Sequence, residues 1–389
     1  MPKKGMSTRS VHDGDRSLVY EGAINTPIFQ SSTFAFPTEE PRSWEGEVPE
    51  GTYIYSRYSN PTVRSVEDKL ASLEGAGSAL AFSSGMAAIT SALMTFLQKG
   101  DRMVAMQDLY GGTYGFLKNE MPRLGVDVAF VTTTDPAELC SAIDCRTKVL
   151  YLESPTNPLL KLIDIRETCR IAHENGCKVM IDNTFASPVL QRPLGMGADI
   201  VLHSATKYLN GHSDVIAGFV AGGKGEMEQV HMRRKIYGGV LDPLPAYLLG
   251  RGMRTLDLRM RKHDSNARVV AEFLEGHDKV SNCIYPGLRS HPDHELAKRQ
   301  MDGFGGMVTF EVKGGRQAAE RAMRRFEIIA KAASLGGVES LASMPVNTSH
   351  TAYGHQERER LGIGEGMIRL SVGIEDPEDL CQDLDSALN

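Results

Sequence analysis

The sequence predicts an α/β protein with a large domain built on a mostly parallel sheet and a smaller α+β domain at the C-terminal end. Apolar runs of strand length alternate with helical segments between residues 79 and 220. This alternation stops near Gly238, and a long helical stretch follows. The chain has 389 residues, of which 41% are hydrophobic, so it exceeds the size that one core usually serves. Two domains are therefore expected.

Residues 1–60 are expected to form an extended arm. They contain several prolines, glycines and hydroxyl side chains, and their apolar stretches are short. Such a segment cannot build its own core, so we expect it to lie against a neighbouring subunit. The arm ends in Tyr55-Ser-Arg57-Tyr-Ser-Asn-Pro61-Thr. The guanidinium of Arg57 suits a phosphate or a carboxylate.

The large domain is expected over residues 61–250. A helix from about Thr62 to Glu74 places apolar residues on one face. The strands that follow are apolar throughout, which is typical of a parallel sheet covered by helices on both faces. The predicted strands are 79–82, 102–106, 126–131, 149–153, 179–182, 200–202 and 215–220, and the predicted helices among them are 87–93, 117–124, 136–143 and 165–175.

The small domain is expected over residues 251–389. A helical stretch from about Pro245 to Gly276 is long enough to connect two domains, with a bend expected near Gly250 and Gly252. Its basic cluster at 259–262 is expected on a solvated helix face. The remaining predicted elements are strands at 281–285, 306–312 and 367–372 and helices at 317–326 and 377–388.

Composition disfavours several classes of protein. The net charge is −6 and both signs are interspersed, so no nucleic-acid surface is expected. No apolar segment follows the N-terminal Met-Pro-Lys-Lys-Gly, and no apolar run reaches membrane-spanning length. The six cysteines form no C-x-x-C pair, and the 11 histidines show no H-x-x-x-H spacing. We expect a cytoplasmic protein without a membrane segment, a disulfide framework or a metal.

The most informative motif is His203-Ser-Ala-Thr-Lys207-Tyr-Leu-Asn-Gly-His212, which follows the apolar run 198–202. Ligands of α/β proteins bind at the carboxyl ends of parallel strands. Burial there would lower the pKa of Lys207, because the charged amine loses hydration, and the neutral amine can attack a carbonyl. Taken alone, the commoner interpretation is a surface lysine that opens a solvated helix.

A second motif, Ser83-Ser84-Gly85-Met86, lies between the strand at 79–82 and the helix at 87–93. Ser84 can cap that helix, and Gly85 lets the backbone approach a ligand. The free N–H groups of the first turn suit a phosphate. A helix cap without any ligand is the commoner occurrence.

Asp182 ends an apolar strand, where an unpaired carboxylate is costly, so it needs a cation or several hydrogen-bond donors. A protonated heterocyclic nitrogen is one candidate. Pyridoxal phosphate also requires an amine and an anion site. Lys207 can provide the amine, and the helix start after Ser84 can provide the anion site together with the hydroxyls of Ser204 and Thr206. Tyr110, in a glycine-rich loop, can stack on such a ring or simply pack at a strand end.

Eight motifs in order resemble the family of cystathionine γ-synthase, γ-lyase, β-lyase and methionine γ-lyase. They lie at 55–62, 84–88, 110–113, 153–158, 182–185, 204–212, 334–337 and 369–373 and span nearly the whole chain. The resemblance implies the type I fold of aspartate aminotransferase and pyridoxal 5'-phosphate as the cofactor. It also implies a homotetramer made of two dimers, with active sites shared between subunits.

The resemblance further implies a role for each site residue. Lys207 would anchor the cofactor and move protons, Tyr110 would cover the ring, and Asp182 would bind the ring nitrogen. The phosphate contacts would come from Gly85, Met86, Ser204 and Thr206, and from Tyr55 and Arg57 of a neighbouring subunit. The substrate contacts would come from Arg369, Ser334, Asn157 and Glu339.

The resemblance ranks γ-elimination of cystathionine to cysteine, 2-oxobutanoate and ammonia first. The alternatives are cystathionine γ-synthase, which acts on O-succinyl- or O-acetylhomoserine, and methionine γ-lyase; a non-catalytic binding protein is the alternative of another class. Gly112 stands where methionine γ-lyases carry a cysteine, and Glu339 resembles γ-lyases and γ-synthases. In the other direction, Ile54 replaces an acidic residue of cystathionine-specific members, and Gly115 replaces an arginine of γ-lyases. The segment 353–367 also resembles methionine γ-lyases.

Overall fold

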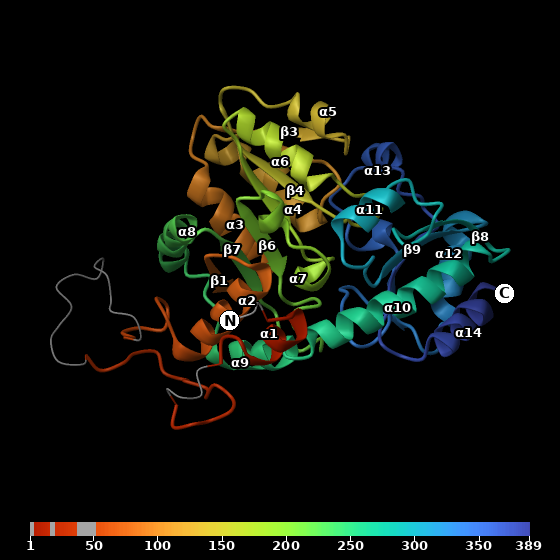
Figure 1. The fold of residues 1–389 in the computed structure, drawn as a ribbon. Coiled ribbons are helices and arrows are strands. Elements are labelled where there is room, and N and C mark those ends of the chain that lie inside the picture. The colour runs from red at the N-terminus through yellow and green to blue at the C-terminus, as the bar shows by residue number, and fades with distance from the viewer. Residues whose placement is uncertain (1–3, 16–19, 37–51) are drawn as a thin grey trace.

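The computed structural model describes residues 4–15, 20–36 and 52–389. Figure 1 shows a large sheet between helices, a smaller sheet beside it, and the helix α10 running from one to the other. This arrangement confirms the predicted α/β fold with a smaller second sheet. The predicted domain boundary between residues 250 and 251 stays a prediction. No helix among the described residues is long and apolar enough to span a membrane.

Within the described residues, the larger sheet has seven strands in the order β1-β7-β6-β5-β4-β2-β3. β7 is antiparallel to both of its neighbours, and the pairs from β6 to β3 are parallel. The carboxyl ends of β2, β4, β5 and β6 therefore meet at one edge of the sheet. The strands are β1 Ser78–Phe82, β2 Arg102–Met106, β3 Asp127–Val131, β4 Thr147–Glu153, β5 Lys178–Asp182, β6 Ile200–Ser204 and β7 Gly218–Gly222.

Two apolar clusters cover the two faces of this sheet. α3, α6 and α8 pack with strand residues such as Leu202 and Val220 on one face, whereas α2 and α9 pack with residues such as Phe219 on the other. The helices that precede the small domain are α1 Met6–His12, α2 Pro61–Glu74, α3 Gly85–Phe96, α4 Gly111–Gly115, α5 Pro136–Cys140, α6 Ile165–Glu174, α7 Ser187–Leu190, α8 Lys224–Tyr237 and α9 Pro243–Met253.

Two elements of the large domain differ from the prediction. The expected helix at 117–124 is a π-helical turn over Phe116–Glu120 and a 3-10 turn over Pro122–Leu124, because Pro122 lacks the N–H that a continuous helix needs. The last strand begins at Gly218 rather than at Val215. The backbone N–H of Ala217 is bonded to Thr206 Oγ1 instead of to a strand.

The predicted helix at 245–276 is two helices. α9 ends at Met253 and α10 begins at Leu256, because Thr255 has a non-helical backbone with φ −102° and ψ 9°. Gly250 and Gly252, where a bend was expected, lie inside α9. A Cβ on Gly252 would lie 2.2 Å from the carbonyl oxygen of Asn210, so this glycine permits a close approach to the segment after Lys207.

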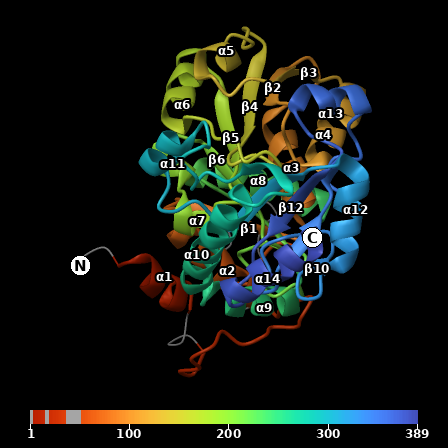
Figure 2. The ribbon, with the colours of Figure 1, turned by 90° about the vertical axis from the view of Figure 1, so that its right-hand side faces the viewer.

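The smaller sheet has the order β10-β11-β12-β9-β8 in the described part of the chain. Figure 2 shows its helices α12 and α14 around it. Its two shortest strands, β10 and β11, were not expected, because two or three residues carry no periodic pattern. The elements are α10 Leu256–Glu275, β8 Val280–Ile284, α11 His294–Gln300, β9 Met307–Val312, α12 Gly315–Arg325, β10 Ala330–Lys331, β11 Leu341–Ser343, α13 His355–Leu361, β12 Met367–Ser371 and α14 Pro377–Leu388.

Candidate active site

Lys207 lies just beyond the carboxyl end of β6. Its Nζ donates a hydrogen bond of 2.7 Å to Ser334 Oγ. Burial, with a smaller contribution from the charge of Arg369, lowers the pKa of Lys207 to about 8. A substantial fraction of the amine is therefore neutral near pH 8, as a nucleophile or a base requires.

Arg259, on α10, holds the segment that carries Lys207. Its guanidinium donates to the backbone oxygens of Tyr208 and Gly252, each at 2.8 Å. The side chain is 3% exposed, so its expected place on a solvated face is wrong. A sequence pattern cannot distinguish an arginine that caps buried carbonyls from one that faces water. Arg259 and α9 together hold the backbone next to Lys207 in place.

Arg369, on β12 of the smaller sheet, and Lys207 both form hydrogen bonds with Ser334. Arg369 donates to Asn157 Oδ1 at 2.9 Å and to the backbone oxygen of Ser334 at 3.0 Å. Burial lowers the pKa of Arg369 to about 10. Its Nε is buried without a hydrogen-bond partner. The structure therefore brings Lys207, Ser334, Asn157 and Arg369 together, and an unused donor of a buried guanidinium suits a carboxylate.

The start of α3 lies against the end of β6. The Ser84 side chain accepts a hydrogen bond from the N–H of Ala87 at 3.0 Å, which confirms the expected cap. A Cβ on Gly85 would lie 3.0 Å from the Cβ of Ser204, so only a residue without a side chain fits easily here. The first turn of α3, with Gly85 and Met86, is thus brought beside Ser204. Such a helix start attracts an anion.

Thr206 uses its hydroxyl within the chain. Its Oγ1 accepts from the N–H of Ala217 at 3.0 Å and lies 3.3 Å from the Ala217 carbonyl oxygen. The residue therefore ties the Lys207 segment to the entry of β7. Its predicted phosphate contact stays a prediction.

Asp182 is the last residue of β5, and its buried carboxylate accepts hydrogen bonds from Thr184. Its Oδ1 accepts from the backbone N–H of Thr184 at 3.0 Å and from the Thr184 hydroxyl at 2.5 Å. Burial nevertheless raises the pKa of Asp182 above its ordinary value. Glu153 lies in register beside it on β4. Burial and the charge of Asp182 raise the pKa of Glu153 well above its usual range.

Glu153 also positions Tyr110. The backbone N–H of Tyr110 donates to Glu153 Oε2 at 3.0 Å. The Tyr110 side chain is 47% exposed, and a Cβ on Gly112 would lie 2.5 Å from its ring. In the sequence, Glu153 lies in the motif at 153–158 and at the end of a predicted strand. Neither observation assigned a function to its side chain.

Three predicted residues do not join this group within the chain. Arg57 donates to the backbone oxygen of Lys235, and its guanidinium lies 5.5 Å from the ring centre of Tyr55. The predicted contact of Tyr55 and Arg57 with the phosphate site of a neighbouring subunit stays a prediction. Glu339 accepts a hydrogen bond from Ser213, and no described hydrogen bond joins it to Lys207 or Arg369.

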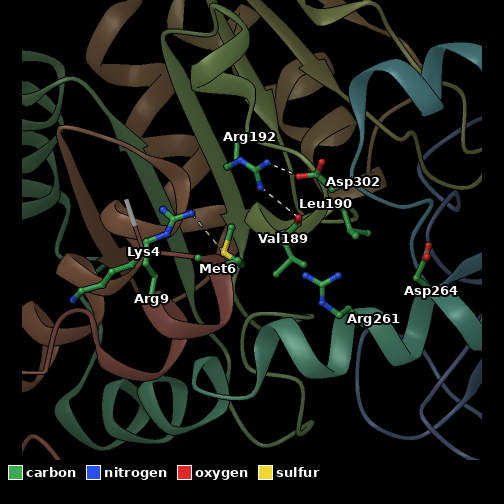
Figure 3. A pocket seen from close by; sticks show the side chains of 10 residues that line it. Lys4, Met6, Arg9, Val189, Leu190, Arg192, Arg261, Asp264 and Asp302 are labelled. Atoms are coloured by element: carbon green, nitrogen blue, oxygen red, sulfur yellow. Dashed lines mark hydrogen bonds and ion pairs between the residues drawn. The ribbon is translucent and has the colours of Figure 1, made fainter. Parts of the chain in front are cut away.

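A cavity of about 720 Å³ lies apart from these residues, between α1, α7 and α10. Figure 3 shows Arg192 paired with Asp302 at its wall. Arg261, also in the wall, is paired with Asp257 at 3.1 Å. None of the predicted site residues lines this cavity, and its main cations already have partners. It is not the candidate active site.

The residues at the strand ends fit pyridoxal phosphate. Lys207 provides an amine with a lowered pKa, and the α3 start provides an anion site that a side chain at Gly85 would crowd. The Asp182 carboxylate is buried and lacks a hydrogen-bonded cation among the described residues. A positively charged ring nitrogen would be an appropriate partner for it.

Comparisons with known proteins agree with this fit. The chain is 47% identical to L-methionine γ-lyase of Treponema denticola, over 100% of this chain and 98% of that protein. It is 44% identical to cystathionine γ-lyase of Bacillus subtilis, over 98% of each. The crystal structure of metB from Corynebacterium glutamicum matches with a TM-score of 0.94 and 42% identity, over 99% of this chain and 98% of that one.

A profile of one family, described as Cys/Met metabolism PLP-dependent enzyme, matches residues 7–389. This match covers both sheets and every described residue of the candidate site. The family's cofactor is pyridoxal phosphate, in agreement with the chemistry of Lys207, Gly85 and Asp182. The chain therefore belongs to the pyridoxal-phosphate-dependent enzymes of cysteine and methionine metabolism.

Proposed function

We propose that the enzyme catalyses γ-elimination on sulfur amino acids and releases a thiol, 2-oxobutanoate and ammonia. One observation carries this proposal: the Lys207 amine lies 2.7 Å from Ser334 Oγ, and the backbone of the same serine binds Arg369. A base with a lowered pKa and a carboxylate-binding cation thus share one neighbour. An amino acid held by Arg369 would present its Cα–H close to the base.

Each residue has a separate task in this reaction. Arg369, oriented by Asn157, would bind the substrate carboxylate. Bound pyridoxal phosphate would supply an electron sink for the charge that develops on the substrate. Lys207 Nζ would take the proton from Cα, release it so that the amine is neutral again, and then take one from Cβ, because its long stem reaches neighbouring carbons. Tyr110, beside the same space, would protonate the departing sulfur.

We propose methionine as the preferred substrate. The distal end of cystathionine carries an ammonium and a carboxylate, which need charged partners once they leave water. Ile54 is apolar, and Gly115 has no side chain and nothing within 4 Å of the place where a Cβ would stand. Neither position supplies a charge. The relative from Treponema denticola, which is named for methionine, supports the same choice.

Cystathionine, which the resemblance ranks first, is the second candidate because of Gly112. The Tyr110 ring occupies the place where a side chain at 112 would begin, 2.5 Å from a Cβ. The cysteine that methionine γ-lyases carry there would require this ring to move. Glu339 gives less support, because its described hydrogen bond is with Ser213 and not with Lys207 or Arg369.

The test compares substrates on the holoenzyme. Methionine, cystathionine and O-succinylhomoserine with cysteine are supplied in turn, and kcat/KM is measured for 2-oxobutanoate or cystathionine formation. We expect kcat/KM for methionine to exceed that for cystathionine by about tenfold, which is the usual scale of discrimination between substrates that differ at one end. Preference for cystathionine would reverse the ranking. Replacement without any 2-oxobutanoate would contradict γ-elimination.

We also propose that Tyr55 and Arg57 complete the site of a neighbouring subunit in a homotetramer. Large apolar side chains near this arm are exposed, including Ile236 at 68% and Leu258 at 72%, and such surface suits a subunit contact. The test mixes Arg57→Ala and Lys207→Ala subunits after mild dissociation. Shared sites predict that the mixture regains activity that neither variant has alone, whereas an inactive mixture would contradict them.

A further inference from the structure

The α13 loop, residues 344–366, connects β11 to β12 and reaches the segment that carries Tyr110. Tyr353, in this loop, is 2% exposed, and its hydroxyl donates a hydrogen bond of 2.8 Å to the backbone oxygen of Gln107. The same hydroxyl lies 3.0 Å from the backbone oxygen of Leu109, the residue before Tyr110. The proposed reaction assigns no task to Tyr353.

A second set of contacts holds the residues that follow Tyr110. The backbone N–H of Tyr114 donates to the backbone oxygen of Tyr110 at 2.9 Å, so the first turn of α4 links the two tyrosines. The Tyr114 hydroxyl donates to Glu357 Oε1 at 2.7 Å, and Lys118 Nζ donates to the same oxygen at 2.8 Å. Figure 2 shows α13, which carries Glu357, next to α4. The α13 loop therefore contacts the chain both before and after Tyr110.

Stacked rings join the two sets of contacts. The ring of Tyr353 lies nearly parallel to that of Tyr114, with centroids 3.9 Å apart and an interplanar angle of 11°. His350 stacks on Tyr353 with centroids 4.8 Å apart. A Cβ on Gly111 would overlap the backbone oxygen of Ser349, so the two backbones approach closely here. Rings packed this closely have little freedom, and the hydroxyls that they carry are held in place.

Tyr110 depends on this support because its own side chain is not held by burial. It is 47% exposed, and no described hydrogen bond reaches its hydroxyl. A proton donor must lie within hydrogen-bond reach of the atom that it protonates, and a displacement of about 1 Å can lower a rate about 100-fold. The α13 loop continues into β12, which carries Arg369. It therefore fixes the proposed acid relative to the proposed carboxylate-binding cation.

We propose that Tyr353 and Glu357 are positioning residues that place the Tyr110 hydroxyl for protonation of the departing sulfur. This inference rests on the proposed function, in which Tyr110 is that acid. As the Cγ–S bond breaks, its electron pair passes to sulfur, the Tyr110 proton bonds to sulfur, and solvent returns a proton to the phenolate. Tyr353 and Glu357 act through the backbone of residues 107–114 rather than on the substrate.

The experiment compares two leaving groups on four holoenzymes: the natural protein, Tyr353→Phe, Glu357→Gln and Glu359→Gln. Tyr353→Phe keeps the stacked ring and removes only the hydroxyl. Glu359→Gln is the matched control, because Glu359 is 66% exposed on the same helix and pairs with His355 of that helix at 3.5 Å. Methionine releases a thiolate, which needs a proton, whereas O-acetylhomoserine releases acetate, which is stable without one. Formation of 2-oxobutanoate measures both eliminations.

We expect Tyr353→Phe to lower kcat about tenfold for methionine and less than about threefold for O-acetylhomoserine. Glu357→Gln should act in the same direction but more weakly, because an amide oxygen still accepts the Tyr114 proton. Glu359→Gln should change neither rate. An equal loss on both substrates in Tyr353→Phe would overturn the inference, because a role in packing alone lowers both reactions together. If Tyr353→Phe does not fold, Tyr114→Phe decides, since it removes only the hydroxyl bound to Glu357.

A double-mutant cycle with Tyr110→Phe gives an independent answer. Once the Tyr110 hydroxyl is absent, its position no longer matters, so adding Tyr353→Phe should lower methionine elimination less than about twofold further. The full tenfold loss in that background would also overturn the inference. A slow Tyr110→Phe, combined with the natural leaving-group preference in Tyr353→Phe, would overturn the inference alone. Natural activity in Tyr110→Phe would instead refute the proposed role of Tyr110 itself.

Discussion

The cofactor half of the site and the substrate half are built in different ways. Asp182, Ser204 and the start of α3 all belong to one sheet and its covering helix, and strand pairing fixes their positions. The substrate half joins two sheets, because Arg369 on β12 reaches Asn157 beyond β4. The difference teaches that, within one subunit, the proposed cofactor contacts lie on the larger sheet and its helices, whereas the proposed substrate contacts come from both sheets.

Lys207→Ala should have the largest effect, because Lys207 serves both halves. Lys207→Ala removes the amine that we propose anchors the cofactor and moves the protons, so kcat should fall by about 10⁴-fold or more. Stopped assays of 2-oxobutanoate release measure this loss, and circular dichroism serves as the control for folding. A folded variant within tenfold of the natural activity would refute the role of Lys207.

Arg369→Lys should break the substrate half alone. A lysine lacks the fork that contacts Asn157 and a carboxylate together, and charged hydrogen bonds contribute about 1.5–3 kcal/mol. We therefore expect KM for methionine to rise about 10- to 100-fold, with a smaller change in kcat. Arg321→Lys, on the exposed face of α12, is the matched control and should leave KM unchanged. An unchanged KM in Arg369→Lys would remove this arginine from the substrate site.

Lys207→Met should stabilise the cofactor-free protein near pH 7. Because the folded pKa is about 8 and the unfolded pKa is higher, the unfolded chain binds more protons between the two values. The charged lysine therefore destabilises the fold below pH 8, and this cost fades as pH rises towards 10. Urea unfolding should show Lys207→Met more stable by about 2–3 kcal/mol at pH 7, with a smaller difference at pH 10. A difference that grows with pH would contradict the lowered pKa.

Glu339→Gln should have the smallest effect. Its partner is Ser213, and its hydrogen bonds do not reach the substrate half. We expect the ratio of kcat/KM for methionine and cystathionine to change less than about threefold, as for a substitution outside the reacting groups. A tenfold change would restore the role in reaction specificity that the resemblance assigns to this residue.

Sequence reasoning predicted the positions of the strand-end residues better than the position of Arg369. Asp182 and Lys207 follow apolar strands, and the carboxyl ends of parallel strands meet by geometry. Arg369 lies in the other domain, so only the family resemblance could place it near Lys207. Arg259 was missed because a buried arginine that binds backbone oxygens has no periodic signature. The contacts of Tyr353 with the residues before Tyr110 were also missed, since they depend on how the α13 loop packs against the larger sheet.

The most direct test of this division is the dissociation constant of pyridoxal phosphate for Arg369→Lys, measured by fluorescence titration of the cofactor-free protein. If the proposed cofactor contacts are independent of the smaller sheet, the dissociation constant should lie within about twofold of that of the natural protein, even though KM for methionine rises. Cofactor binding that weakens as much as substrate binding would contradict the division, because it would show that the two halves form one interdependent unit.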